Sequence, residues 1–322
     1  MPRHATTPPG MTTLVLLSGI SVLSLNMFLP SLSNIAEEMQ VSYAVANLSI
    51  AGYLVVTAIL QVIIGPLSDR YGRRPVLLVS LALFTVASLG CYTADDIRSF
   101  LTFRVLQGGV VSGMVLGRAA IRDMFPAQEA AARMGYVNMI MALAPMLGPL
   151  LGGVVDEYLG WRMTFLFFTA SGVGLLLLTY ADLGETNKHP SETFLQQFRS
   201  YPELFTSRRF WGYSFVLTFS VGSFYLFIAG VPLVGARVFG LSPSAVGLGV
   251  GIISGGFMLG NFVSGRMARR FSLTTMMIAG RVATVAGLML GLALLLVGVV
   301  CPAVVFGAGV FVVFGNGLSL PA

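Results

Sequence analysis

Long apolar runs fill most of the chain, and short joints rich in charge, proline or glycine separate them. Each run has about the 20 residues that a helix needs to cross the hydrocarbon core of a membrane. Both faces of these runs are apolar, so they lack the polar stripe of a water-exposed helix. The pattern predicts about ten spanning helices, at Thr12–Leu32, Tyr43–Ile64, Pro75–Tyr92, Phe100–Leu116, Met134–Val155, Met163–Tyr180, Phe210–Val231, Ser244–Val263, Thr275–Val299 and Ala303–Leu320.

The amino-acid composition also indicates that lipid surrounds most of the chain. Hydrophobic residues make up 56% of the chain and charged residues 10%, whereas a soluble domain carries about 25% charged residues. A surface so poor in charge fits lipid better than water. The net charge of +6 lies in short clusters between the apolar runs. That distribution is typical of membrane orientation and argues against a nucleic-acid partner.

The usual patterns of catalytic and metal-binding residues are missing from the sequence. It contains no Ser/His/Asp arrangement, no metal-ligand spacing and no phosphate-binding loop. Two cysteines, Cys91 and Cys301, are too few for a disulfide scaffold. We interpret them as small apolar helix residues, with one bridge between them as the alternative. We therefore expect no enzyme, no metal site and no cofactor.

The positions of Lys and Arg predict the orientation in the membrane. Joints on the cytoplasmic side carry the excess of these residues. With the N-terminus inside, the outer joints hold only Arg98, Arg162 and Arg237, while Arg104 and Arg281 fall within apolar runs. An error of one helix would scramble this pattern. We expect a multi-pass protein of the plasma (inner) membrane with a cytoplasmic N-terminus.

A long polar stretch, Ala181–Arg209, divides the apolar runs into six and four. We predict an all-α membrane protein with a six-helix N-terminal bundle at 1–181, a cytoplasmic linker at 182–209 and an incomplete C-terminal bundle at 210–322.

Residues 69–74 (DRYGRR) and 265–270 (GRMARR) form an internal repeat. Two six-helix halves are a known transporter plan, so we expect about two further helices to be absent after Ala322.

Residues 65–74 (GPLSDRYGRR) resemble the signature loop between the second and third helices of the major facilitator superfamily. The two glycines allow a tight loop and close helix approach. The resemblance implies that Asp123 pairs with Arg73 near Asp69. The spacing disfavours the alternative, a plain positively charged inner loop. We expect a charge cluster that latches helices at the inner face, formed by Gly65, Asp69, Arg70, Gly72, Arg73, Arg74 and Asp123.

Arg104 opens a second motif, in the fourth predicted helix. The segment Arg104-Val-Leu-Gln-Gly108 resembles another motif of the superfamily. An arginine at the bilayer centre costs about 3 kcal/mol or more, so it persists where it faces a cavity or pairs with an acid. We favour that interpretation over the alternative, an arginine near the outer helix end that reaches the interface.

Glycines and prolines alternate in the fifth predicted helix. Residues 145–153 (PMLGPLLGG) resemble the motif of the superfamily's antiporters. Glycines four residues apart share a helix face and allow close packing, and prolines favour bending. A simple packing kink is the alternative. We interpret this segment as a hinge formed by Pro145, Gly148, Pro149, Gly152 and Gly153.

Three smaller features narrow the resemblance to the Bcr/CflA group of drug/proton antiporters. They are residues 26–30 (NMFLP), 118–123 (RAAIRD), and Trp161-Arg162 with the phenylalanines that follow. The resemblance covers the whole chain, without the last two helices of the family. It implies export of small amphipathic drugs or toxic compounds in exchange for protons by alternating access. The implied partners are this substrate, protons and the lipid bilayer, and we expect a monomer.

Asn26 departs from the family's pattern, which usually has an aspartate at this position. All thirteen acidic residues fall in predicted loops or at helix ends, with Asp156 a poor substitute. A proton-coupled carrier normally has a titratable group in its pathway. The resemblance therefore implies proton antiport, while the residues do not show where the proton binds. Either the missing helices supply that group or the coupling is lost.

Polar residues at helical spacing predict the substrate site. Carriers of this plan bind substrate near the bilayer midplane between the halves. Tyr53, Thr57 and Gln61 recur every four residues and share one helix face, which we expect to point inward. Each is equally able to hold helices together by hydrogen bonds. The candidate substrate-binding residues are Asn26, Tyr53, Thr57, Gln61, Arg104, Gln107, Asn138, Met141 and Tyr225, with Tyr213, Ser220 and Phe224 as a further wall.

Three functions stay open on these grounds. The first is proton-driven efflux of amphipathic drugs, and the second is a metabolite facilitator or importer of the same fold. The third is a non-transporting, truncated membrane protein. The helix-five motif favours the first, Asn26 weakens it, and the end at Ala322 supports the third.

Overall fold

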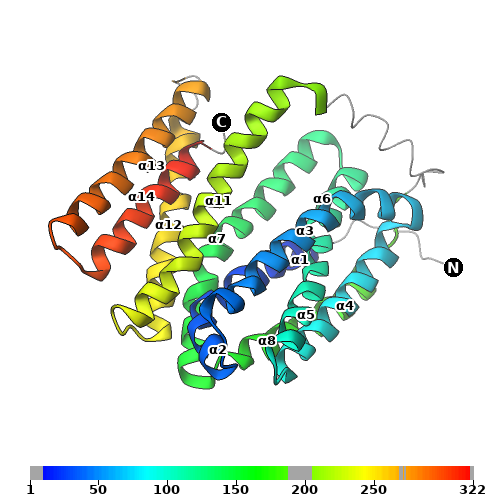
Figure 1. Ribbon diagram of the computed structural model, residues 1–322. Helices are drawn as coiled ribbons and strands as arrows, with labels where there is room; N and C mark the ends of the chain where they lie inside the picture. Colours follow the sequence, from blue (N-terminus) through cyan, green and yellow to red (C-terminus); the bar gives the residue numbers. More distant parts are fainter. Residues whose placement is uncertain (1–9, 188–204, 268–270, 272, 320–322) are drawn as a thin grey trace. The chain divides into compact units, whose positions relative to one another are not determined.

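The computed structural model describes residues 10–187, 205–267, 271 and 273–319, and most of them form helices (Figure 1). Among these residues, nine helical segments are long and apolar enough to cross a membrane. They coincide with nine of the predicted spans. The other predicted span, Met134–Val155, lies in the 33-residue helix α7 (Ala127–Leu159). The expectation of an all-helical membrane fold is confirmed.

The chain forms two compact units. Of the described residues, the first unit holds 10–26, 34–144 and 159–187, and the second holds 27–33, 145–158 and 205–319. Helix α7 contributes to both units, and the division falls between Ala144 and Pro145. The predicted bundles at 1–181 and 210–322 stay predictions. Most of the predicted linker, 182–209, lies outside the described residues.

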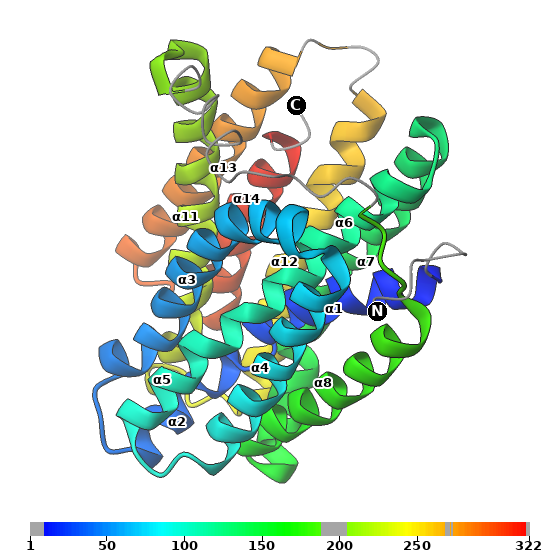
Figure 2. The same ribbon diagram turned by 90° about the vertical axis from the view of Figure 1, so that its right-hand side faces the viewer.

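In the first unit, helices α4 and α8 lie side by side (Figure 2). Aromatic side chains fill this part of the core, because the Phe100 ring meets Trp161 at 5.6 Å and Phe165 at 5.4 Å between ring centres. Edge-to-face rings at such distances pack favourably. The unit's helices are α1 (Met11–Asn26), most of α2 (Leu32–Glu38), α3 (Tyr43–Tyr71), α4 (Arg73–Thr93), α5 (Ile97–Gln107), α6 (Val111–Met124), α8 (Arg162–Asp182) and the first part of α7.

Two of the spans are interrupted where the sequence predicted continuous helices. The first span stops at Asn26 and resumes through a 3-10 turn, Leu29–Ser31, which contains Pro30. Proline lacks the amide hydrogen that a continuous α-helix needs. The fourth span contains a 3-10 turn at Gly108–Val110. Two adjacent glycines weaken the α-helix at that point.

In its described part, the second unit consists of residues 27–33, the end of α7 and four further helices. Helices α13 and α14 lie side by side in this unit (Figure 1). The sequence of each helix is apolar, with arginine at the ends of α11 and α12 and Arg281 inside α13. The bounds are α11 (Arg208–Arg237), α12 (Pro243–Met267), α13 (Leu273–Leu296) and α14 (Pro302–Ser319).

Candidate functional site

Arg104 lies at the centre of a buried polar cluster in the first unit. Its side chain is 0% exposed, so it does not reach an interface. Its Nη1 donates hydrogen bonds to Oε1 of Gln107 and to the carbonyl oxygen of Ser24, the latter at 3.3 Å. Its guanidinium carbon lies 4.7 Å from the ring centre of Tyr53 and 5.7 Å from that of Phe165. Both distances allow cation–π attraction.

Neighbouring hydroxyl groups extend this cluster across the unit. The Tyr53 hydroxyl lies 2.5 Å from Oγ of Ser24, and Nε2 of Gln107 donates to Oγ of Ser88 at 2.7 Å. The cluster thus joins α1, α3, α4 and α5, with Phe165 supplied by α8. Sequence reasoning selected Tyr53, Arg104 and Gln107 but missed both serines. Serine is common in membrane helices, so its presence alone is no signal.

The polar line on α3 is shorter than predicted. Tyr53 and Thr57 are buried, and the Thr57 hydroxyl donates to the Leu54 carbonyl oxygen at 2.9 Å within its own helix. Gln61 is exposed, so it does not share the burial of the other two, and its place in the substrate site stays a prediction. Residues four apart are offset by about 40° on a helix with 3.6 residues per turn, and two steps double that offset.

The remaining predicted residues of the first unit lie apart from the Arg104 cluster. Asn26 is 0% exposed, and its Nδ2 donates to the Val22 carbonyl oxygen at 2.8 Å. Its Oδ1 has no hydrogen-bond partner within the part of the chain that the structure describes. Asn138 and Met141 of α7 contact a different arginine, because Nη2 of Arg118 lies 3.2 Å from Oδ1 of Asn138 and 3.6 Å from Sδ of Met141.

Tyr225 belongs to a cavity of the second unit. Ser220, Phe224 and Pro145 were predicted as functional and line the same cavity, whereas Tyr213 is exposed and does not. Sequence reasoning missed Phe257 and Asn316. The cavity measures about 200 Å³ and is lined by Pro145, Ser220, Val221, Phe224, Tyr225, Phe257 and Asn316.

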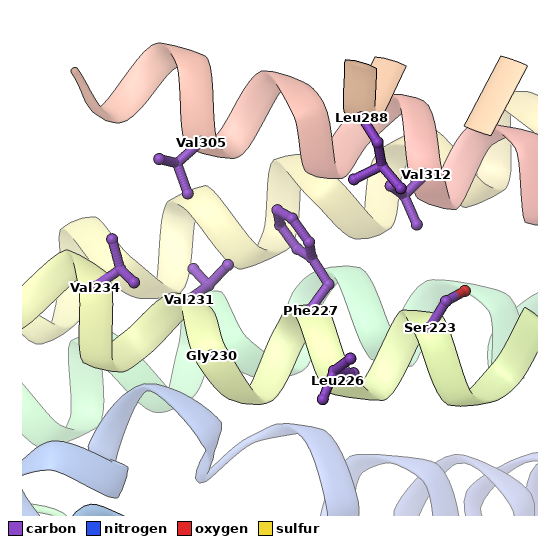
Figure 3. Close-up of a pocket in the computed structure, with 9 residues that line it drawn as sticks. All are labelled: Ser223, Leu226, Phe227, Gly230, Val231, Val234, Leu288, Val305 and Val312. Carbon is purple, nitrogen blue, oxygen red and sulfur yellow. The ribbon is translucent and has the colours of Figure 1, made fainter. Parts of the chain in front are cut away.

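A second cavity of about 320 Å³ lies in the same unit, against α11, α13 and α14. Figure 3 shows that its lining is apolar apart from Ser223 near one end. Its other lining residues are Leu226, Phe227, Gly230, Val231, Val234, Leu288, Val305 and Val312.

Arg73 holds the charge cluster of the first unit together. It forms ion pairs with Asp69, at 3.1 Å, and with Asp123 of α6, and its Nη1 donates to Oγ of Ser68 at 3.1 Å. The expected contact between Arg73 and Asp123 is therefore present. Asp69 lies in the last turn of α3, which runs to Tyr71, and not in a loop. The role of this cluster in transport stays a prediction.

Gly72 alone separates α3 from α4. Its φ of +95° is a conformation that side chains rarely adopt, so glycine is suited to this junction. The carboxylate of Glu185 accepts the amide hydrogens of Arg73 at 3.0 Å, Arg74 at 3.2 Å and Asn187 at 2.8 Å. A carboxylate at a helix N-terminus satisfies amides that lack helical partners. Sequence reasoning missed Glu185, because nothing local relates it to a helix that starts more than a hundred residues earlier.

The other members of the predicted charge cluster, Gly65, Arg70 and Arg74, take no part in the ion pairs of Arg73. Gly65 makes no close approach to another described segment, because apart from its own helix and neighbours no described atom lies within 4 Å of the position a Cβ would take. That part of the prediction is wrong. Arg74 donates to the Tyr180 carbonyl oxygen at 2.9 Å and lies 5.0 Å from the Tyr180 ring centre. Arg70 lies 5.5 Å from the ring centre of Tyr71.

The glycines of the predicted hinge pack tightly within the second unit. A Cβ on Gly152 would collide with the Met27 carbonyl group, and one on Gly153 with that of Pro243. Gly247 of α12 meets the Pro149 carbonyl group in the same way. Gly148 is buried, and Pro145 is the first α7 residue of the second unit. These contacts fit both the hinge and the packing interpretation, so the hinge stays a prediction.

The fold and the helix-joining polar clusters define a multi-pass membrane protein of the transporter class. The model of the Major Facilitator Superfamily matches residues 14–322, so the chain belongs to this superfamily. Superfamily members are transporters, which confirms the expectation that the chain is not an enzyme.

Individual relatives agree with this assignment. "Uncharacterized MFS-type transporter YdgK" of Bacillus subtilis is 32% identical over 278 residues, which cover 82% of this chain and 69% of the relative. "Multidrug resistance protein D" of Escherichia coli is 27% identical over 260 residues, covering 80% and 66%. The chain thus spans about two thirds of the length of these curated relatives.

A solved structure shares the fold. It is a bacterial homolog of the human lysosomal transporter Spinster, in an inward-facing and unoccupied conformation. Its TM-score is 0.72 at 18% sequence identity, covering 96% of this chain and 72% of that chain. At this identity the likeness shows the fold alone.

Proposed function

We propose that this protein is a secondary active transporter that exports small amphipathic drugs or toxic compounds by proton antiport. The observation that carries the proposal is the likeness to a relative named for multidrug resistance, which extends over 260 residues. Membership of the superfamily supports transport, and the relative's name supports the class of substrate. The sequence features of the Bcr/CflA group support the same class.

The mechanism we propose is alternating access. The ion pairs of Arg73 with Asp69 and Asp123 join the end of α3 to the end of α6, and they stabilise the outward-facing state by holding the inner ends of these helices. The clustering of Arg and Lys in alternate joints supports a cytoplasmic N-terminus in the inner membrane. Residues 145–153 act as the hinge, because α7 changes from one unit to the other at Pro145.

The substrate contacts fall into two groups in this proposal. In the second unit, Phe224, Tyr225 and Phe257 offer aromatic surface, and Ser220 and Asn316 offer hydrogen bonds, around one cavity. Cavities with apolar walls and few polar groups suit amphipathic ligands. In the first unit, Tyr53, Thr57, Gln61, Arg104, Gln107, Asn26, Asn138 and Met141 remain the candidates.

A facilitator or importer that works without protons is the second candidate function. The observation that favours it is the placement of acidic residues. Every Asp and Glu in the described ranges lies in a loop or within the first or last turn of a helix. Asn26, which is buried at the end of α1, does not titrate. Uncoupled transport would need no titratable group within the membrane.

Uptake into inverted membrane vesicles separates the two functions. We expect energised vesicles that contain this protein to accumulate radiolabelled chloramphenicol, and an uncoupler to abolish that uptake. Uptake that is indifferent to the uncoupler would favour the facilitator. No uptake above vesicles without the protein would contradict export of this drug.

The Asp69→Asn variant tests the mechanism in the same assay. We expect uptake to slow several-fold while chloramphenicol binding to the purified protein is unchanged, because the variant loses an ion pair and no substrate contact. Unchanged turnover would contradict the role of the charge cluster. Glu129→Gln is the matched control, because it removes an ion pair with Arg133 at the start of α7.

A further inference from the structure

Arg281 places a positive charge inside the apolar helix α13. It lies eight residues after the first residue of the helix, Leu273, which corresponds to about 12 Å along the helix axis. The sequences of α11, α12, α13 and α14 contain no Asp or Glu. A guanidinium group stays protonated even when it is buried. No residue of these four helices therefore supplies a counter-charge.

The guanidinium group has one hydrogen bond in the described part of the chain. Nη1 of Arg281 donates to Oδ1 of Asn316 at 3.1 Å, while its Nε and Nη2 are buried and have no hydrogen-bond partner there. Buried donors normally find acceptors. The contact joins α13 to α14, so the charge is held at a defined place in the unit.

Asn316 links this charge to a cavity, because it contacts Arg281 and is itself one of the cavity's lining residues. Its Nδ2 donates to the Ser220 carbonyl oxygen at 2.8 Å and lies 3.5 Å from Oγ of Ser223, so its Oδ1 is left for Arg281. The same Asn316 side chain lines the cavity of about 200 Å³, together with Phe224, Tyr225 and Phe257. Ser223 lines the larger apolar cavity, where its hydroxyl lies near one end of the wall (Figure 3).

We propose that Arg281 and Asn316 bind the acidic group of an amphipathic substrate, whose apolar part occupies the cavity lined by Phe224, Tyr225 and Phe257. This inference rests on the proposed transport function and adds to its substrates a preferred class, compounds with a carboxylate or a similar anion. A carboxylate accepts two parallel hydrogen bonds from a guanidinium group, and it supplies the missing counter-charge. It takes the place of the Asn316 oxygen at Nη1 and reaches a second nitrogen atom of Arg281.

A matched pair of dyes tests the acidic group directly. Tetramethylrhodamine carries a free carboxylate, and its methyl ester has the same ring system without that negative charge. We measure the affinity of both dyes for the purified protein in detergent by fluorescence anisotropy. We expect the acid to bind about tenfold more tightly than the ester, as one charge-assisted hydrogen bond would give.

Variants of Arg281 identify the group that reads the charge. Arg281→Gln is expected to abolish the preference, because it weakens binding of the acidic dye and leaves binding of the ester unchanged. Arg281→Lys is expected to retain part of it, because lysine keeps the charge but not the planar fork. Arg237→Gln, at the end of α11, is the matched control and should leave the preference intact.

Three results would overturn the inference. The first is equal affinity of the wild-type protein for the two dyes, and the second is that neither dye binds. The third is that Arg281→Gln and Arg281→Lys lower the affinity for both dyes equally. The last result would assign Arg281 a structural role. Each leaves the proposed function standing if chloramphenicol uptake still depends on the proton gradient. Loss of that uptake alone would contradict the proposed function instead.

Discussion

Arg104 and Arg281 lie within apolar runs of this protein, and their surroundings differ. Arg104 in the first unit has two aromatic rings, a glutamine and a backbone carbonyl group around its guanidinium. Arg281 in the second unit makes a single hydrogen bond, to Asn316, among the described residues. Both charges are costly within a membrane. The first charge has two hydrogen-bond acceptors and two aromatic rings around it, and the second has one acceptor among the described residues.

This difference separates two uses of a charge within an apolar helix. A guanidinium that is enclosed by rings and acceptors from several helices holds those helices in one arrangement, because removing it leaves several groups without partners. A guanidinium with spare donors that is linked to a cavity through one asparagine is suited to binding an anion. The same residue type therefore predicts a packing role in the first unit and a recognition role in the second.

The largest expected effect is on stability, and it comes from Arg104. Arg104→Gln should lower the free energy of unfolding by about 3 kcal/mol, because a buried hydrogen-bond network is broken. Arg281→Gln should lower it by less than about 1 kcal/mol, because only one hydrogen bond is lost and an unneutralised charge is removed. Thermal unfolding of the purified proteins in detergent measures both. Equal shifts in the two variants would remove the distinction between the arginines.

A smaller effect is expected when Arg281 is given a partner of its own. Asn316→Asp places a carboxylate beside the guanidinium, so the substrate's anion is no longer needed and the acid dye should lose its tenfold advantage, about 1.4 kcal/mol. The acidic dye would then bind no better than its ester. Asn47→Asp makes the same change in α3 of the first unit, away from the candidate substrate residues, and should leave the preference unaltered. An acid preference that survives Asn316→Asp would contradict the recognition role.

The smallest effect concerns the start of the helix that carries Arg104. Asp96 caps α5, and the Ser99 hydroxyl, followed by the Ser99 and Arg98 amides, holds its pKa below the ordinary value of 3.8. Because this pKa is lowered on folding, the ionised cap stabilises the folded protein fully at a pH above the pKa that Asp96 has in the unfolded chain. This stabilisation is lost as the pH falls through the pKa of Asp96 in the folded protein.

Hydrogen exchange of the α5 amides at decreasing pH measures the cap. We expect protection of these amides to fall at low pH in the wild-type protein and to be less pH-dependent in Asp96→Asn. Identical profiles for the two proteins would show that Asp96 does not stabilise α5 through its charge.

Some functional residues can be recognised from their immediate sequence neighbours, and others cannot. Residues 65–74 were found because their spacing is read along one stretch of chain, and Arg104 was found because a charge stands out in an apolar run. Glu185, Ser88 and Asn316 were missed. Each of them acts on a distant segment, so its sequence neighbours carry no sign of the contact.

The spans, their class and the family motifs were determined by the sequence alone, because hydropathy and charge are properties of short segments. The tertiary structure decided that Gly65 makes no close contact, that Gln61 is exposed, and that Arg281 meets Asn316 of another helix. Helical periodicity tells which residues share a face but not which face packs against which helix. Only packing between distant segments shows which buried charges are compensated.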